Sequence, residues 1–144
     1  MATVQDLRAS IEEKRRNLRE AIESASDRWE VASGPDEWTP RATAEHAISM
    51  EWMYAGMLAE AVQGDAPERQ TLSLANAQEA LSALEAAIQD CTPGLGNVTG
   101  ADLSKPAEIR GEVPSPDIPK TVEGVLWLTA FHLDDHAQQI AATV

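Results

Sequence analysis

The sequence contains a single cysteine, Cys91, and no long run of hydrophobic residues. One cysteine cannot form an internal disulfide, and its isolation fits a reducing compartment. The N-terminal segment lacks the apolar stretch that a signal peptide requires, and no later segment approaches the roughly 20 apolar residues of a membrane span. We therefore expect a cytoplasmic protein that does not insert into a membrane.

Positive charge is also scarce. The 144 residues include 11 Lys and Arg against 24 Asp and Glu, which gives a formal net charge of −13. Nucleic acids and anionic membrane surfaces are bound through cationic surfaces, so this charge argues against both as partners. A chain of this length is most simply one domain, residues 1–144, with one hydrophobic core.

Runs of Val, Ile and Thr are absent, and the hydrophobic residues are mostly Ala and Leu, which favours helix over sheet. Apolar residues recur at intervals of three, four or seven, the spacing of an amphipathic helix. This pattern predicts four helices, over about residues 3–31, 39–63, 71–90 and from 119 onward. Thr39 and Pro40 have the residue types of an N-cap and a first helical residue.

The longest predicted connection, residues 91–119, lies before the last helix and is rich in Gly and Pro. A segment of this length inside a compact domain is a crossover, a functional lid or an element that the pattern fails to reveal. We interpret it as a crossover that also forms part of a lid. Four long helices with one long connection predict an all-α four-helix bundle.

Two of the three histidines, His132 and His136, lie four residues apart on the inward stripe of the last helix. That spacing brings both imidazoles to one face, about one helical turn apart. His46 has an inward-facing position on the second helix. Three neutral imidazoles can hold a divalent cation and leave coordination positions open, so we predict a metal site at His46, His132 and His136. Zinc is expected and nickel or iron would also fit; the alternative is three independent core histidines.

The positions of the histidines along their helices restrict the topology. His46 lies roughly 9 Å from the start of its helix, whereas the other two lie about 14 Å from the end of theirs. The histidines of the two helices lie at similar heights along the bundle axis if the second and fourth helices are antiparallel, and less so if they are parallel. Because a short loop makes the first and second helices antiparallel as well, the bundle needs a crossover, which the long connection can supply.

Other notable side chains have structural interpretations. Asp135 steps off the inward stripe, so we expect it to face solvent. Glu51 is either an inward carboxylate or part of an exposed helix flank. Cys91 lies near the negative pole of the third helix, which would raise the pKa of its thiol, so we expect a structural role. Three tryptophans either line a pocket or pack in the core, and the core is the more common place for them: Trp38, Trp52 and Trp127.

Two short motifs resemble those of the DinB/YfiT-like family of metalloenzymes. The first is Trp38-Thr39-Pro40 followed by Glu45-His46, and the second is HLDDHAQQI, from His132 to Ile140. Family members typically combine a Trp-Ser/Thr start to helix two with a histidine about two turns later and a final His-x3-His-x2-Gln. The two motifs are short, but they span the chain in the same helix order.

The resemblance implies an up-down-down-up four-helix bundle, often dimeric, in which the three histidines bind a divalent metal in a cleft. It places the crossover between helices two and three, whereas the longest connection here precedes the last helix. Characterised relatives include thiol-dependent S-transferases and a maleylpyruvate isomerase that use low-molecular-weight thiols such as mycothiol or bacillithiol. The resemblance therefore implies, as an expectation, a homodimeric, metal-dependent transferase or isomerase whose substrate is a small electrophile.

A function of another class is compatible with the same residues. In this alternative the chain is a non-catalytic dimeric helical module that binds a metal or a small molecule, and the metal site is vestigial or stabilising. A three-histidine site beside an enclosed pocket favours the enzyme, because open coordination positions are typical of catalytic sites. A closed four-ligand site or an empty cleft favours the module.

Overall fold

The computed structural model describes residues 3–111 and 113–142. In these ranges the regular structure is helical, apart from one isolated antiparallel bridge between Pro106 and Thr121. The long helices are α1 (Val4–Ser24), α2 (Pro40–Val62), α3 (Ala77–Asn97) and α4 (Val122–Ala142), and the short 3-10 helices are η1 (Ser26–Arg28) and η2 (Gly100–Asp102). The prediction of an all-α fold with four helices is confirmed. None of the helices in the described ranges is long and apolar enough to cross a bilayer.

Side-chain caps determine where α1 and α2 begin. The Thr3 hydroxyl accepts a hydrogen bond from the Asp6 N–H, and the Asp6 carboxylate accepts one from the Thr3 N–H, both at 3.1 Å. The Thr39 hydroxyl accepts from the Ala42 N–H at 3.1 Å, and Pro40 occupies the first helical position, where no N–H is needed. The predicted start of the second helix is therefore correct.

Helix α3 begins later than the apolar periodicity predicted. Asn76 caps it by accepting a hydrogen bond from the Glu79 N–H at 2.9 Å. The residues before this cap are held by hydrogen bonds to other segments of the chain instead. The Leu74 N–H donates to the Glu45 carboxylate at 2.8 Å, and the Leu74 carbonyl accepts from the Trp29 indole at 2.9 Å. These tertiary hydrogen bonds keep the segment outside the helix.

The other helix ends also differ from the expected ones. Helix α3 continues through residues 91–97, Pro93 included, because buried Cys91 and Leu95 extend its apolar stripe. Helix α1 ends at Ser24, before the expected residue 31, and the chain continues as η1. These differences arise where tertiary packing overrides local propensity.

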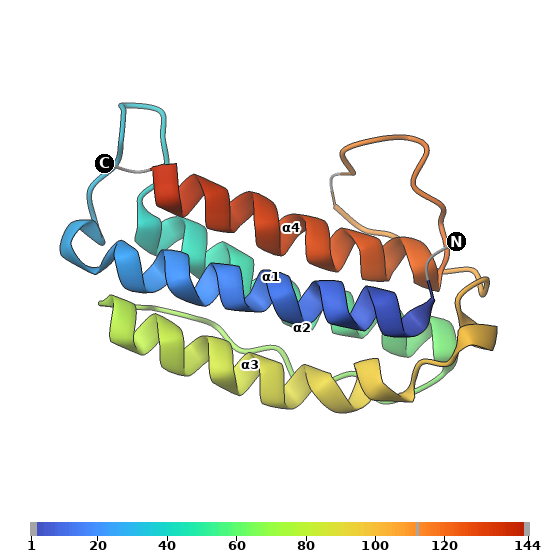
Figure 1. Ribbon diagram of the computed structural model, residues 1–144. Coiled ribbons are helices and arrows are strands. Elements are labelled where there is room, and N and C mark those ends of the chain that lie inside the picture. The colour runs from blue at the N-terminus through green and yellow to red at the C-terminus, as the bar shows by residue number, and fades with distance from the viewer. Residues whose placement is uncertain (1–2, 112, 143–144) are drawn as a thin grey trace.

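In the bundle, α1 packs against α3 and α4, and α2 also packs against α3 and α4. Figure 1 shows α1 and α4 running in one direction and α2 and α3 in the other. Hydrogen bonds join the neighbouring ends. Arg8, near the start of α1, donates to the carbonyls of Leu95 and Gly96 at the end of α3. Arg41, at the start of α2, donates to the Ser73 hydroxyl just before α3.

The crossover is the connection between α2 and α3. Because these helices begin at the same end of the bundle, residues 63–76 return along its length (Figure 1). About 14 extended residues can span on the order of 45 Å, more than the roughly 35 Å length of a helix such as α2. The longer connection, residues 98–121, joins neighbouring ends of α3 and α4. Its interpretation as the crossover is therefore wrong.

Helix α4 starts in close contact with the chain that precedes it. A Cβ at Gly124 would lie 1.9 Å from the Pro119 carbonyl oxygen, so only glycine fits this position without a shift of the backbone. The Val122 N–H donates to the Lys105 carbonyl at 3.0 Å. These contacts fix the start of α4 and hence the level of the two histidines that it carries.

Candidate metal centre

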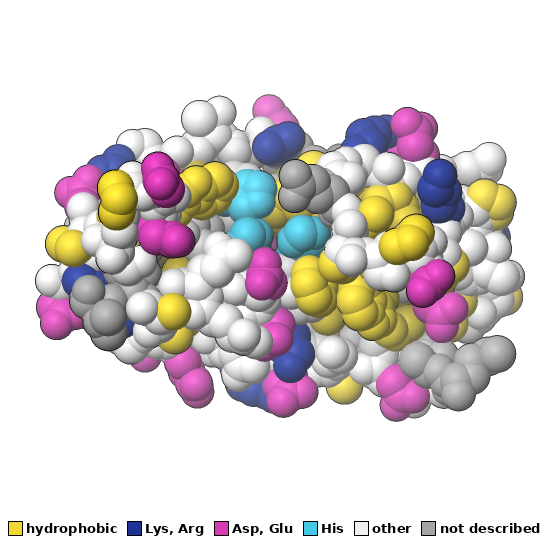
Figure 2. All heavy atoms as spheres, turned by 90° about the horizontal axis from the view of Figure 1, so that it is seen from above, with side chains coloured by type: hydrophobic (Ala, Val, Ile, Leu, Met, Phe, Trp, Pro, Cys, Tyr) yellow, Lys and Arg dark blue, Asp and Glu magenta, His cyan; other side chains and the backbone are white. Residues whose placement is uncertain are grey.

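A cleft of about 780 Å³ opens beside α2 and α4. Helix α2 contributes His46, Met50 and Met53, helix α4 contributes His132, Asp135, His136 and Gln139, and the segment before α2 contributes Asp36, Glu37 and Trp38. Gly111 also lines it, so the long connection forms one edge of the cleft. Figure 2 shows the three histidine side chains together on one face of the molecule, with hydrophobic side chains beside them.

All three histidines predicted as metal ligands line this cleft. His46 lies two turns into α2, and His132 and His136 are one turn apart on the antiparallel helix α4. The ring centroids of His46 and His136 are 4.8 Å apart, with an interplanar angle of 89°. Those of His132 and His136 are 5.7 Å apart, with an angle of 21°. The three rings therefore form one cluster.

The spacing of the rings fits a shared ion, although their present orientation does not coordinate one. Zinc–nitrogen bonds of about 2.1 Å in a tetrahedral site place neighbouring imidazole centroids roughly 5 Å apart. The observed 4.8 and 5.7 Å agree with that separation. Within residues 3–111 and 113–142, no three His, Cys, Asp or Glu side chains are already positioned to hold a metal ion. Coordination therefore requires the imidazoles to rotate about their side-chain bonds.

Gln139 and Asp135 orient the His136 ring. His136 Nδ1 lies 3.2 Å from Gln139 Oε1, which can only accept, so we assign the ring hydrogen to Nδ1. The Gln139 amide donates in turn to Asp135 Oδ2 at 3.1 Å. This tautomer leaves an electron pair on His136 Nε2, a buried atom without a hydrogen-bond partner in the described part of the chain. A buried polar atom of this kind is costly, and a ligand in the cleft would give it a partner.

Burial favours the neutral form of His46 and His136. It lowers the pKa of His46, and the nearby His136 and Arg69 lower it further. Burial likewise lowers the pKa of His136, although the hydrogen bond with Gln139 partly offsets this effect. Both rings are therefore neutral at pH 7, the state in which an imidazole can donate an electron pair to a metal.

Aromatic side chains pack around the histidines. Tyr54 stacks on His132, with ring centroids 5.6 Å apart and an interplanar angle of 26°. Trp38 contacts His46 edge-on, at a centroid distance of 5.5 Å. Tyr54 is buried, whereas Trp38 is 54 % exposed. The histidines thus lie between a buried ring and an exposed ring at the mouth of the cleft.

The core, the more common of the two places considered for the three tryptophans, is wrong for two of them. Trp38 precedes α2 and lines the cleft instead. Trp127 lies on the outer face of α4, where it is 44 % exposed and stacks on Phe131 at a centroid distance of 5.2 Å. Trp52 is buried as expected, and its indole donates to the Asp90 carboxylate at 3.1 Å.

The structure shows the positions of two carboxylates, Asp135 and Glu51, whose orientation was inferred from the sequence. Asp135 does not simply face solvent, because it is half-buried and lines the cleft. The helical spacing contained this information, since positions 132, 135, 136 and 139 share one stripe of a helix. Glu51 is the inward carboxylate that we considered. It accepts a hydrogen bond from the Arg15 guanidinium of α1 at 2.8 Å rather than lining the cleft.

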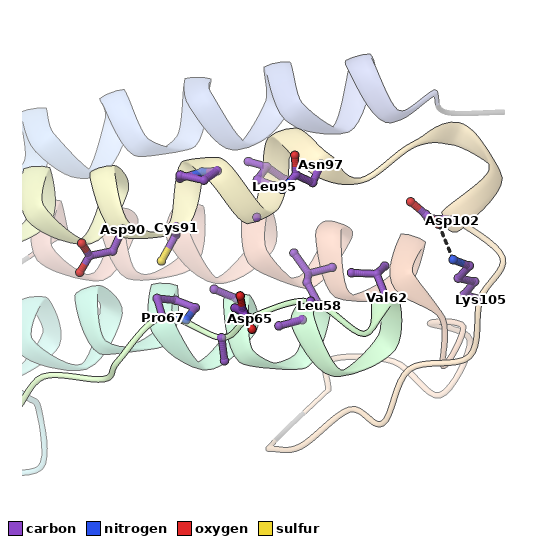
Figure 3. A pocket seen from close by; sticks show the side chains of 16 residues that line it. Leu58, Val62, Asp65, Pro67, Asp90, Cys91, Leu95, Asn97, Asp102 and Lys105 are labelled. Atoms are coloured by element: carbon purple, nitrogen blue, oxygen red, sulfur yellow. Dashed lines mark ion pairs between the residues drawn. The ribbon is translucent and has the colours of Figure 1, made fainter.

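A second cavity, of about 540 Å³, lies between α2 and α3 (Figure 3). Cys91, in its wall, is buried, and burial is the main reason that the pKa of its thiol rises to about 12. The effect has the direction expected from the helix pole, but its principal cause is burial. Lys105 Nζ lies 2.6 Å from Asp102 Oδ1, so this cation is already paired. The second cavity therefore has fewer side chains that could bind or activate a ligand than the histidine cleft.

Comparison with known proteins adds one match. A family model described as the DinB superfamily matches residues 10–140. The matched range includes all three histidines of the cleft and most of each long helix. No curated protein and no solved structure matches the chain.

Proposed function

Because the chain belongs to the DinB superfamily, we propose that it is a metal-dependent enzyme whose ion is held by His46, His132 and His136. Zinc is the expected ion, and nickel or iron would accept the same ligands. The observation that carries this proposal is the buried, unpartnered Nε2 of His136 inside a cluster of three histidines. The reaction is transfer of a low-molecular-weight thiol to a small electrophile, or a thiol-dependent isomerisation.

The chain's own residues supply orientation, shielding and a fixed tautomer. Gln139 accepts the Nδ1 hydrogen of His136 and is itself held by Asp135, an arrangement that directs Nε2 towards a ligand. Met50 and Met53 give the cleft an apolar wall that limits the access of water. A divalent ion in such a site lowers the pKa of a bound thiol or water.

The proposal extends to the assembly and location of the protein. The helix order is the up-down-down-up order of the family, and the protein forms a homodimer in the cytoplasm, where small thiols are reduced. The exposed Trp127, stacked on half-buried Phe131, supports the dimer because large exposed apolar side chains often mark interaction surfaces. Sedimentation that shows only monomer at micromolar concentration would contradict it.

The metal site is tested by metal analysis of purified protein and by titration with zinc in competition with a chelator. We expect about one ion per chain, and His136→Ala should weaken binding by at least about 100-fold. Gln139→Ala should weaken it about tenfold, because it removes only the group that orients the ligand. Gln138→Ala is the matched control, since Gln138 is an exposed neighbour on α4 that does not line the cleft.

Activity is tested on the metal-loaded protein with a panel of small thiols and electrophiles. His132→Ala and His136→Ala should abolish thiol transfer while the circular dichroism spectrum stays helical, because buried Val125, Leu126 and Ile140 still anchor α4. A histidine variant that retains full activity would refute metal-assisted catalysis. Tight metal binding without any reaction across the panel would favour the non-catalytic binding module instead.

A further inference from the structure

The charged residues that line the histidine cleft are all acidic in the described part of the chain. They are Asp36 and Glu37, just before α2, and Asp135 on α4. Asp135 is hydrogen-bonded to Gln139, whereas Asp36 and Glu37 are exposed and form no side-chain ion pair with the described residues. The mouth of the cleft therefore carries two carboxylates that remain available to a ligand.

Two arginines on segments that contribute to the cleft are paired with carboxylates. Arg41 bonds to Glu30 at 2.8 Å and to Glu45 at 3.3 Å. Arg110, beside the cleft residue Gly111, places Nη2 2.7 and 2.6 Å from the two carboxylate oxygens of Glu60. These pairs offset the positive charge of both arginines.

Arg69 is a separate case. It acts electrostatically on His46, but it does not line the cleft. The chain as a whole has a net charge of −13, so the long-range potential is negative as well. An anionic ligand would meet repulsion on approach, whereas a cation would be attracted.

Trp38 supplies an aromatic surface next to these carboxylates. It directly follows Glu37 in the chain, it is 54 % exposed, and it lines the same cleft. An ammonium group is attracted to the face of an indole ring and to carboxylates, and the two together are a recurrent way to recognise a cation. Met50 and Met53, deeper along α2, offer an apolar surface for the rest of a ligand.

From these contacts we infer that the substrate of the cleft is a small apolar or aromatic molecule that carries an ammonium group. Its cation lies at the mouth, against Trp38, Asp36 and Glu37, and its apolar part extends towards the histidines. The inference deepens the proposed function and rests on it for the identity of the reacting site. It also implies that a thiol with free carboxylates is a poor co-substrate.

The test uses metal-free protein, so that it does not depend on metal binding. Three probes of similar size are titrated at low ionic strength: 2-phenylethylamine, 2-phenylethanol and phenylacetate. Binding is followed in nitrogen–proton correlation spectra through the Trp38 indole and the Gly111 amide. We expect the amine to bind at least about fivefold more tightly than the carboxylate, the effect of two partly exposed charge interactions.

Variants assign the preference to the mouth of the cleft. Asp36→Asn/Glu37→Gln should weaken binding of the amine about fivefold and change binding of the alcohol by less than about twofold. Glu13→Gln/Glu20→Gln makes the same change in net charge at exposed positions of α1 outside the cleft, and it should have little effect on either probe.

Three results would overturn the inference. They are equal or tighter binding of phenylacetate, equal losses in the two double variants, and amine-induced shifts confined to the second cavity or absent at millimolar concentration. Failure of the proposed function has a different signature. In that case wild type retains no metal and transfers no thiol, whatever the charge preference of the metal-free cleft.

Discussion

Outside the cleft, a buried ion pair joins Arg15 of α1 to Glu51 of α2. Two nitrogens of the Arg15 guanidinium lie 2.8 Å from Glu51 Oε2, and a third lies 2.7 Å from Glu12 Oε1. The Arg15 and Glu51 side chains are 2 % and 1 % exposed, whereas Glu12 is 53 % exposed. Arg15→Met therefore leaves one carboxylate buried without its partner and the other in water.

The loss of stability in Arg15→Met depends on whether Glu51 is protonated in the folded variant. Burial already raises the pKa of Glu51 above its ordinary value of 4.5, and Arg15 partly offsets that rise. Without Arg15 the folded protein keeps this carboxyl protonated, at a cost of about 1.4 kcal/mol for each pH unit above the ordinary value. We therefore expect a loss of stability at pH 7.5 in the range of about 3–5 kcal/mol that is typical of a broken buried pair.

The pH dependence has a definite sign. Because the folded-state pKa of Glu51 is raised, its contribution to stability is fully present below the unfolded value and is lost as the pH rises through the folded value. The Arg15→Met protein should therefore become progressively less stable from pH 5 to pH 7.5. Arg15→Met/Glu51→Leu has no buried charge at this place, so it should lack this slope and lie within roughly 1 kcal/mol of wild type.

Urea unfolding followed by circular dichroism at several pH values measures these differences, with the double variant as the matched control. At pH 7.5 the single variant should unfold roughly 10 °C below wild type in a thermal scan. A loss of less than about 1 kcal/mol would show that the pair contributes little net stability. A gap between single and double variants that does not change with pH would refute the account based on Glu51 protonation.

Three further substitutions and one labelling experiment have expected outcomes. Gly124→Ala should destabilise the protein by about 1–3 kcal/mol in urea, since its Cβ would overlap the Pro119 carbonyl. Gly56→Ala, with nothing within 4 Å of the new Cβ, should be neutral or stabilising; equal losses in both would contradict the argument. Gln63→Gly should raise the free energy of unfolding by about 1 kcal/mol, because the φ of 57° at Gln63 favours glycine. A lower urea midpoint for this variant would contradict the prediction. The raised thiol pKa, about 12, predicts that folded Cys91 resists a thiol reagent at pH 8 and reacts fully in urea; fast labelling of the native protein would contradict its burial.

Part of the candidate site could be predicted from the spacing of residues along the helices. Two histidines four residues apart on an apolar stripe had to share one face, and an inward His46 on a second helix was a reasonable third member. The same rule applied to Asp135, which is three residues from His132, but its place next to His136 was interpreted as a step off the inward stripe and therefore as solvent-facing. The exposed position of Trp38 had no signal of this kind, because it precedes α2 and no periodicity constrains it.

The sequence by itself determined the elements that depend on local chemistry. Apolar periodicity indicated four helices, and the Thr39-Pro40 pair fixed the start of α2, because capping and proline geometry act within a few residues. The positions of the histidines along their helices also favoured antiparallel second and fourth helices, if the three side chains share one site.

Only the tertiary structure decided which segment crosses the bundle and where α3 begins and ends. Residues 71–76 lie outside α3 because Glu45 and Trp29 bond to the backbone of Leu74, and residues 91–97 continue it because Cys91 and Leu95 are buried. Partners far apart in the chain supply these interactions, and their free energies outweigh the small differences in local helix propensity. Whether a polar side chain such as Glu51 meets a cation or a cleft is decided in the same way, by the helix that packs against it.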